Sequence, residues 1–169
     1  ESPEGERVMV AWMHTWGRKL VTNDFGHKWY GQMTLPRILK KNENGLHQVL
    51  PTSVLEAFKD IEIGQSIKGP SKFSLKLEDS LELRLGSDQD YLQFGYDKES
   101  QEVYIDRGHL DIQQTGEEEW STIRRSVTVE AEELLIMIDT NCVEIFVNNG
   151  QEVLTSTYYV EGQRTLNTL

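Results

Sequence analysis

Apolar and polar residues alternate with a period of two along most of this chain, in short runs separated by turn-forming residues. The clearest runs are Phe73-Ser74-Leu75-Lys76-Leu77 and Leu81-Glu82-Leu83-Arg84-Leu85. Such alternation is typical of strands with one buried and one solvated face. No long amphipathic helical pattern separates the runs, so helix-linked parallel strands are not expected. The pattern predicts an all-β protein built as a two-sheet antiparallel β-sandwich.

Further strands are predicted wherever the same pattern recurs between turn residues. Hairpin turns are expected at Asn44-Gly45 and at Asn148-Asn149-Gly150, because Asn and Gly accept the positive φ that tight turns require. Residues 7–12 resemble a buried strand with little alternation, which predicts a core position for Trp12. The other predicted strands cover residues 35–40, 46–50, 91–96, 102–106, 122–129, 134–139, 143–147 and 152–159.

One short segment breaks the period of two. In Pro51–Phe58, Ser53 is followed three residues later by Glu56, which is the pattern of a helix capping box. We expect one or two helical turns that act as a connector. The chain is thereby divided into residues 1–50, a short helical linker at 51–60, and a β-sandwich at 61–169.

Composition excludes several classes of partner. The formal net charge is −11, from 28 acidic and 17 basic residues. A phosphate backbone and an anionic membrane surface are both repelled by this balance, so neither nucleic acid nor membrane is expected as a partner. The apolar run Leu134–Ile138 is far too short to span a bilayer. Cys142 is the single cysteine and lies in an apolar run, which predicts a buried, unreactive thiol.

The titratable residues form no recognisable catalytic or metal-binding motif. Most acidic residues lie at alternating strand positions, such as Glu82, Glu144 and Glu152, or in turns, and are expected at the surface. No two of the four histidines have metal-ligand spacing, and nucleophile-elbow, phosphate-loop and dinucleotide motifs are missing from the sequence. No catalytic residue, metal site or cofactor is therefore predicted within the chain.

Aromatic residues gather near the start of the chain. Three of its four tryptophans, Trp12, Trp16 and Trp29, lie there. Trp16 follows the predicted strand end and precedes Gly17 and a polar loop. An exposed indole at such a position can pack on the C–H face of a sugar ring. Trp16 is therefore the candidate substrate-binding residue.

Two motifs carry a resemblance to a known family. The first is Trp12-Met13-His14-Thr15-Trp16 followed by residues 29–37, which read Trp-Tyr-Gly-Gln-Met-Thr-Leu-Pro-Arg; the second is residues 139–156. They resemble glycoside hydrolase family 32, which contains the invertases, levanases, inulinases and sucrose-6-phosphate hydrolases. The first motif is similar to the last blade of the family's β-propeller, and the second to a hairpin of its C-terminal sandwich. Ala11 and Cys142 stand where the family usually has Gly and Ser.

The resemblance implies a fold for residues 1–50 and places the catalytic residues outside this sequence. Residues 1–50 would be strands from the last propeller blade, and Trp16 matches a tryptophan that lines the family's fructose pocket. The family's catalytic Asp and Glu residues lie in W-M-N-D-P-N-G, R-D-P and E-C motifs. This sequence contains no Asp-Pro, and Cys142 follows Asn141 rather than Glu. A retaining glycosidase needs two close carboxyl groups, so the chain alone is expected to be inactive.

The function implied is that of a non-catalytic C-terminal portion of a β-fructofuranosidase-type enzyme. The whole enzyme would hydrolyse terminal β-fructosyl bonds in sucrose, sucrose 6-phosphate or fructan without a cofactor. Its partners would be that sugar and the propeller of the same polypeptide. A cytoplasmic location is favoured by the single cysteine together with the likeness to sucrose-phosphate hydrolases.

Two other functions remain open from the sequence. The sandwich could be a fructan- or glycan-binding module, for which Trp120 is the candidate aromatic residue. It could instead be a structural domain that forms a homo-oligomer. A separate propeller blade would expose residues such as Trp12 and Met33. We therefore expect the first fifty residues either to dock on the sandwich or to take part in oligomer contacts.

Overall fold

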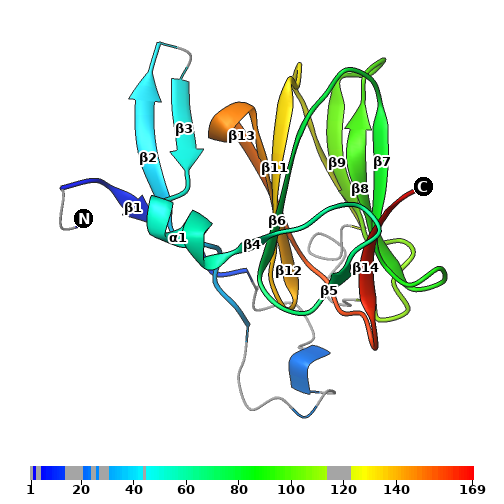
Figure 1. Cartoon of the computed structure of the whole chain (residues 1–169). Helices are drawn as coiled ribbons and strands as arrows, with labels where there is room; N and C mark the ends of the chain where they lie inside the picture. Colours follow the sequence, from blue (N-terminus) through cyan, green and yellow to red (C-terminus); the bar gives the residue numbers. More distant parts are fainter. Residues whose placement is uncertain are drawn as a thin grey trace.

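A computed structural model describes residues 2, 5–13, 21–23, 26, 31–43, 45–113 and 123–169 of the chain. Its strands form three sheets, and two of them stack face to face as a sandwich (Figure 1). Within the described residues every strand pairing is antiparallel except that of β4 with β6. The predicted all-β sandwich is confirmed.

The first sheet is small and stands beside the sandwich. It has the order β1-β2-β3 and is built from β1 (Val8–Met9), β2 (Arg37–Asn42) and β3 (Gly45–Val49). β2 and β3 form the expected hairpin, and Gly45 has the positive φ of 122° that the turn was predicted to need. A 3-10 turn, η1 (Val21–Asn23), lies between β1 and β2 in the sequence.

The sandwich consists of a five-stranded and a six-stranded sheet. The five-stranded sheet has the order β13-β12-β11-β6-β4, and the six-stranded sheet has the order β10-β9-β8-β7-β14-β5. β4, β5 and β14 were not predicted, because they are short or contain a single apolar residue. The bounds are β4 (Lys59–Asp60), β5 (Ser66–Ile67), β6 (Ser71–Lys76), β7 (Leu81–Gly86), β8 (Tyr91–Asp97), β9 (Glu102–Asp106), β10 (Arg124–Thr128), β11 (Glu133–Ile138), β12 (Cys142–Val147), η3 (Asn148–Gly150), β13 (Glu152–Thr157) and β14 (Arg164–Thr168).

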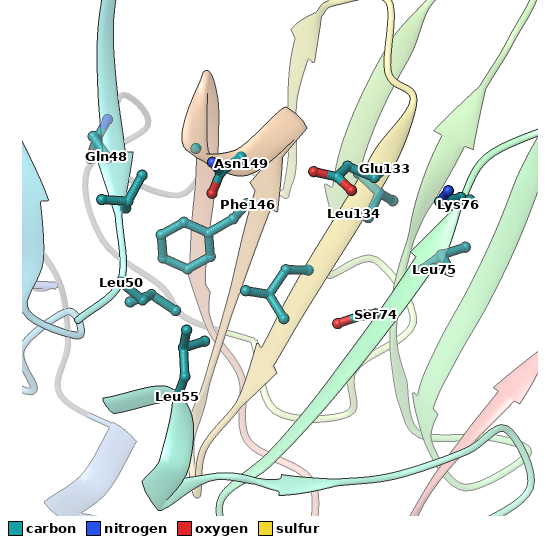
Figure 2. Close-up of a pocket in the computed structure, with 13 residues that line it drawn as sticks. Gln48, Leu50, Leu55, Ser74, Leu75, Lys76, Glu133, Leu134, Phe146 and Asn149 are labelled. Carbon is teal, nitrogen blue, oxygen red and sulfur yellow. The ribbon is translucent and has the colours of Figure 1, made fainter. Parts of the chain in front are cut away.

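A short helix lies between the first sheet and the sandwich in the sequence. α1 (Thr52–Ala57) follows β3 and lies against the outer face of the five-stranded sheet (Figure 2). The expected capping box is wrong, because Pro51 occupies the N-cap position and no side chain caps the helix. The Pro51 carbonyl instead accepts the amides of Val54 and Leu55, at 3.0 and 3.2 Å. Ser53 therefore lies inside the first turn rather than before it.

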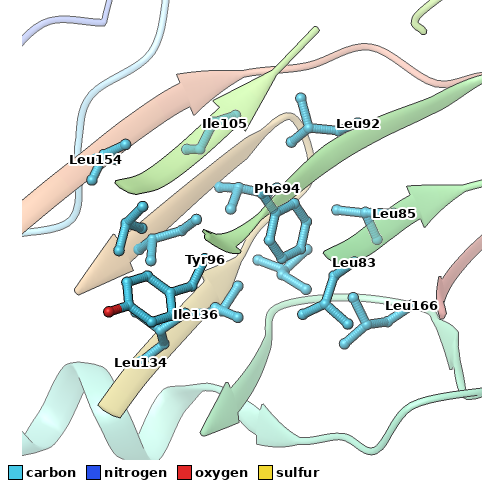
Figure 3. Close-up of a cluster of buried hydrophobic side chains, with 14 of the residues drawn as sticks. Leu83, Leu85, Leu92, Phe94, Tyr96, Ile105, Leu134, Ile136, Leu154 and Leu166 are labelled. Atoms are coloured by element: carbon cyan, nitrogen blue, oxygen red, sulfur yellow. The ribbon is translucent and has the colours of Figure 1, made fainter. Parts of the chain in front are cut away.

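The main core lies between the two large sheets. The inward residues of β7, β8 and β9 meet those of β11 and β12 (Figure 3). Leu83, Phe94 and Ile136 are fully buried there. Leu166 of β14 closes the same layer, although a strand with this one apolar residue showed no alternation in the sequence.

Several apolar side chains of the first sheet and of the segments beside it are exposed. Residues 7–12 were predicted to form a buried strand, but only Val8–Met9 form β1, and Trp12 makes an isolated bridge with Met33. Trp12 is 43% exposed and Met33 is 53% exposed, so the core assignment of Trp12 is wrong. The reason is that, among the described residues, none packs over the Trp12–Met33 bridge closely enough to bury these two side chains.

Candidate functional site at the interface of the first sheet with the sandwich

The five-stranded sheet is buried on both faces where the first sheet meets it. Every residue of β12 is buried, including those that point away from the main core. A second hydrophobic cluster covers this outer face and is centred on Phe58, Met137 and Phe146. Its other members come from the segment before β2, from the residue after β3, from α1 and from β11 and β13: Leu35, Leu50, Val54, Leu55, Leu135 and Val153. The first sheet is therefore docked on the sandwich, which was one of the two predicted arrangements.

A buried carboxylate lies at the centre of this interface. Glu144 is 1% exposed, and its Oε1 accepts the backbone amide of Leu35 at 2.6 Å. Its Oε2 accepts both Nε and Nη2 of Arg37, with Nε at 3.1 Å. The expected surface position of Glu144 is wrong, because the first sheet covers the strand face from which this side chain projects. The ion pair joins β2 directly to β12.

Arg37 is satisfied by groups from both sides of the interface. Its Nη1 donates to Gln48 Oε1 at 2.7 Å, and its Nη2 also donates to Thr155 Oγ1 at 2.6 Å. The guanidinium carbon lies 5.4 Å from the ring centroid of Phe146. Buried charges are tolerated when they are paired and their remaining donors are satisfied, and Arg37 meets both conditions. Its planar fork can also hold a fixed geometry that a lysine cannot.

Burial and ion pairing shift the pKa of Glu144 in opposite directions. Burial raises the pKa of its carboxyl above the ordinary value of 4.5, while the Leu35 amide and the Arg37 guanidinium oppose the rise. The burial effect is the larger, so the folded protein holds the Glu144 proton to a higher pH than the unfolded chain does.

The raised pKa of Glu144 makes the stability of the protein depend on pH. We compare the free energy of unfolding of the unchanged protein with that of the Glu144→Gln variant. The difference, unchanged protein minus variant, is expected to fall as pH rises from 4.5 through the raised folded-state pKa. The reason is that the unfolded state releases the Glu144 proton at lower pH than the folded state. Urea unfolding of both proteins between about pH 4 and 8 measures this difference, in which the other carboxylates cancel. A difference that grows with pH would contradict the prediction.

Two backbone contacts complete the interface. Gln32 Nε2 donates to the Asn141 carbonyl at 2.8 Å, just before β12. After β12, Gly150 presses so closely on β3 that a Cβ at this position would lie 2.1 Å from the Gln48 carbonyl oxygen. Gln32 and Arg37 belong to the first sequence motif, whereas Asn141, Glu144 and Gly150 belong to the second. The two motifs are opposite sides of one interface.

The sequence contained a signal for this two-sided burial. Leu134–Ile138 and Cys142–Val147 carry apolar residues at neighbouring positions instead of alternate ones. Continuous apolar runs are typical of strands covered on both faces. A lone Glu144 within such a run is then expected to need a buried partner.

Cys142 is buried at the edge of this interface, as predicted. It is 7% exposed, and burial raises the pKa of its thiol well above the ordinary value. We predict that the native protein does not react with Ellman's reagent at pH 8, because the thiolate is the reactive form. One thiol per chain should react once the protein is unfolded in urea. Rapid reaction in the native state would contradict the assignment.

The candidate aromatic residues of the sequence fall elsewhere. Trp16 and Trp120 lie outside the described residues, so their placement as sugar contacts stays a prediction. Within the described ranges, no group of His, Cys, Asp or Glu residues is arranged to hold a metal ion. No helix among these residues is long and apolar enough to cross a membrane.

Known proteins match this sequence over most of its length. The model of the glycosyl hydrolase family 32 C-terminal region matches residues 30–168. A probable sucrose-6-phosphate hydrolase from Psychromonas ingrahamii is 28% identical, over 98% of this chain and 31% of the relative. The sucrose-6-phosphate hydrolase of Vibrio alginolyticus is 27% identical, over 93% of this chain and 33% of the relative. The chain thus spans about a third of the length of these relatives.

Solved structures share the fold. The sucrose-6-phosphate hydrolase from Lactobacillus gasseri superposes with a TM-score of 0.75 at 17% identity, over 97% of this chain and 36% of that one. A family 32 β-fructofuranosidase from Bombyx mori gives a TM-score of 0.72 at 15% identity, over 99% of this chain and 36% of that one. Together with the family model, these likenesses show that the chain belongs to glycosyl hydrolase family 32, of which it represents the C-terminal region.

Proposed function

We propose that the chain is the non-catalytic C-terminal portion of a β-fructofuranosidase-type hydrolase and that it buttresses the catalytic part. The observation that carries this proposal is the interface built around the buried Arg37–Glu144 pair, which ties the first sheet to the sandwich. The sequence itself lacks the Asp-Pro motifs in which the family's catalytic acids lie. A role in stability and placement fits a chain with these features better than a role in bond cleavage.

The three-part organisation belongs to the same proposal. Residues 1–50 are assigned to the last propeller blade, 51–60 to the linker and 61–169 to the sandwich. The exposed apolar side chains of the first sheet and of the segments beside it support the blade, because residues such as Val10, Trp12 and Met33 gain most from a neighbouring sheet. A second copy of the chain would cover the same side chains in an oligomer. Sedimentation of the longer protein and of the chain distinguishes a neighbouring sheet of the same polypeptide from a second copy of the chain.

The substrate of the whole enzyme is inferred from the relatives. Two of them are named as sucrose-6-phosphate hydrolases, which supports sucrose 6-phosphate ahead of sucrose or fructan. Trp16 is the residue of this chain that we assign to the sugar. In the longer protein, Trp16→Ala is expected to lower kcat/KM, while Trp120→Ala leaves it unchanged. The reverse result would support the glycan-binding module instead.

The central test compares two proteins. The purified chain and the longer protein that its gene encodes are assayed side by side for fructose release from sucrose and sucrose 6-phosphate. The chain is expected to release none, and the longer protein to turn over. Fructose release by the chain would overturn the proposal. So would a reading frame that carries no W-M-N-D-P-N-G, R-D-P and E-C motifs ahead of Glu1.

A further inference from the structure

A groove of about 420 Å³ lies beside the docking interface. It opens where α1 and β3 leave part of the outer face of the five-stranded sheet uncovered (Figure 2). Leu50 and Leu55 line one side, the buried Phe146 lies beneath the groove, and Asn149 lies at one end. Leu135 also lines it. Its size falls within the range of about 300–1,000 Å³ that is usual for small-ligand sites.

Four polar side chains line this groove without a partner of their own. Ser74, Lys76, Glu133 and Asn149 are exposed, and none of the four side chains makes a hydrogen bond or ion pair within the described part of the chain. Lys76 and Glu133 face each other across β6 and β11. The groove therefore combines an apolar floor with an ammonium, a carboxylate, an amide and a hydroxyl group that are all available to a ligand.

The turn that carries Asn149 is held in place. Asn148 and Asn149 both have positive φ, 47° and 55°, a conformation that costs free energy for residues other than glycine. The Asn148 side chain accepts the Glu132 amide and donates to the Glu130 carbonyl, each at 2.8 Å. These bonds fix the turn, so the Asn149 amide is presented to the groove in a preorganised position.

The mixture of charges decides the class of ligand. Lys76 is offset by Glu133, and Glu132 lines the adjoining depression, so a phosphate or other anion would be repelled. A purely apolar ligand would leave the four polar groups desolvated and unpaired. A neutral sugar chain meets both requirements, because its C–H faces can pack on the half-buried leucines of the groove while its hydroxyls bond to amide, ammonium and carboxylate groups.

We propose that this groove is a binding site for a short neutral oligosaccharide, separate from the pocket in which the parent enzyme would cleave its substrate. The site goes beyond the proposed function, because it needs no catalytic carboxylate and lies within this chain alone. It would retain the sugar chain at the outer face of the sandwich, next to the interface that holds the first sheet.

The test is a titration of the full 169-residue chain with nystose, a neutral fructo-oligosaccharide, followed by amide NMR and calorimetry. We expect saturable binding with a Kd on the order of millimolar. The shifted amides should be those of residues 74–76, 133–135 and 146–150. Glucose 6-phosphate, a charged sugar, is titrated in parallel and is expected to bind more weakly.

Two variants probe the groove without disturbing the core. Asn149→Gly keeps a residue that accepts positive φ and removes only the amide, and should weaken binding about fivefold. Ser74→Phe fills the groove from an exposed strand position and should abolish binding. Thr128→Phe places the same bulk on an exposed position of β10 in the other sheet and should leave binding unchanged.

Several results would overturn the site. One is the lack of saturation up to about 50 mM nystose. Others are tighter binding of the charged sugar than of nystose, and an equal loss of nystose binding in Ser74→Phe and Thr128→Phe. Full binding by both groove variants, with their melting temperatures preserved, would do the same. None of these outcomes bears on fructose release, so the site and the proposed function fail independently.

Discussion

Replacing Arg37 with alanine is expected to lower the free energy of unfolding by about 3–5 kcal/mol, the cost of leaving a buried charge without its partner. Glu144 would keep only the Leu35 amide, while Gln48 and Thr155 would each lose a donor. Urea unfolding at neutral pH, followed by circular dichroism, measures the change. A loss below about 1 kcal/mol would mean that the pair does not hold the interface together.

A double replacement and a surface control make this result specific. Arg37→Met combined with Glu144→Leu is expected to cost much less than Arg37→Ala, because apolar residues of similar size can replace a buried ion pair without leaving a charge. Lys98, whose side chain is 57% exposed, pairs with Asp79 at the surface. Lys98→Ala should therefore change the free energy of unfolding by only about 0–1 kcal/mol. Additive losses for the two interface residues would contradict the pairing.

Replacing Gly150 with alanine is expected to destabilise the protein by about 2–5 kcal/mol. Positive φ accounts for about 1–2 kcal/mol of this, and overpacking for about 1–3 kcal/mol. Gly150 has φ of 85°, and its added Cβ would lie 2.1 Å from the carbonyl oxygen and 2.7 Å from the carbonyl carbon of Gln48. Since both atoms belong to the backbone of β3, the clash is relieved only if the first sheet moves away from the sandwich.

A second glycine separates the two contributions. Gly162 has nearly the same φ, 86°, but an added Cβ there would meet nothing within 4 Å. Gly162→Ala should therefore show the conformational cost alone, about 1–2 kcal/mol. Faster proteolysis between β3 and β4 in Gly150→Ala than in Gly162→Ala would locate the damage at the interface. If both variants lose the same free energy of unfolding, the close approach of Gly150 to β3 is not the cause of the loss.

The strands and turns were largely predictable because the signals for them are local. Alternation in Leu81–Leu85 reflects the two faces of a single strand, and Asn148-Asn149-Gly150 contains the residues that its own backbone conformation requires. The helical connector was recognisable as a break in the period, although its capping was not. β14 escaped prediction because Leu166 joins the core through its neighbours β7 and β5 and not through a pattern of its own.

Burial of the individual residues depended on which surfaces meet. Trp12 was assigned to the core from the apolar run around it, and Glu144 to the surface from its place in an alternating strand. Both assignments were reversed by what covers each side chain. Period-two alternation tells how a strand divides its side chains between two faces, but it contains no information on how many layers will be stacked. The first sheet covers the outer face of β12 and buries the Glu144 carboxylate, whereas the described residues leave the Trp12 indole 43% exposed. The local pattern was therefore sufficient for the fold class, whereas the interface around Arg37 and Glu144 arose from contacts between segments more than one hundred residues apart.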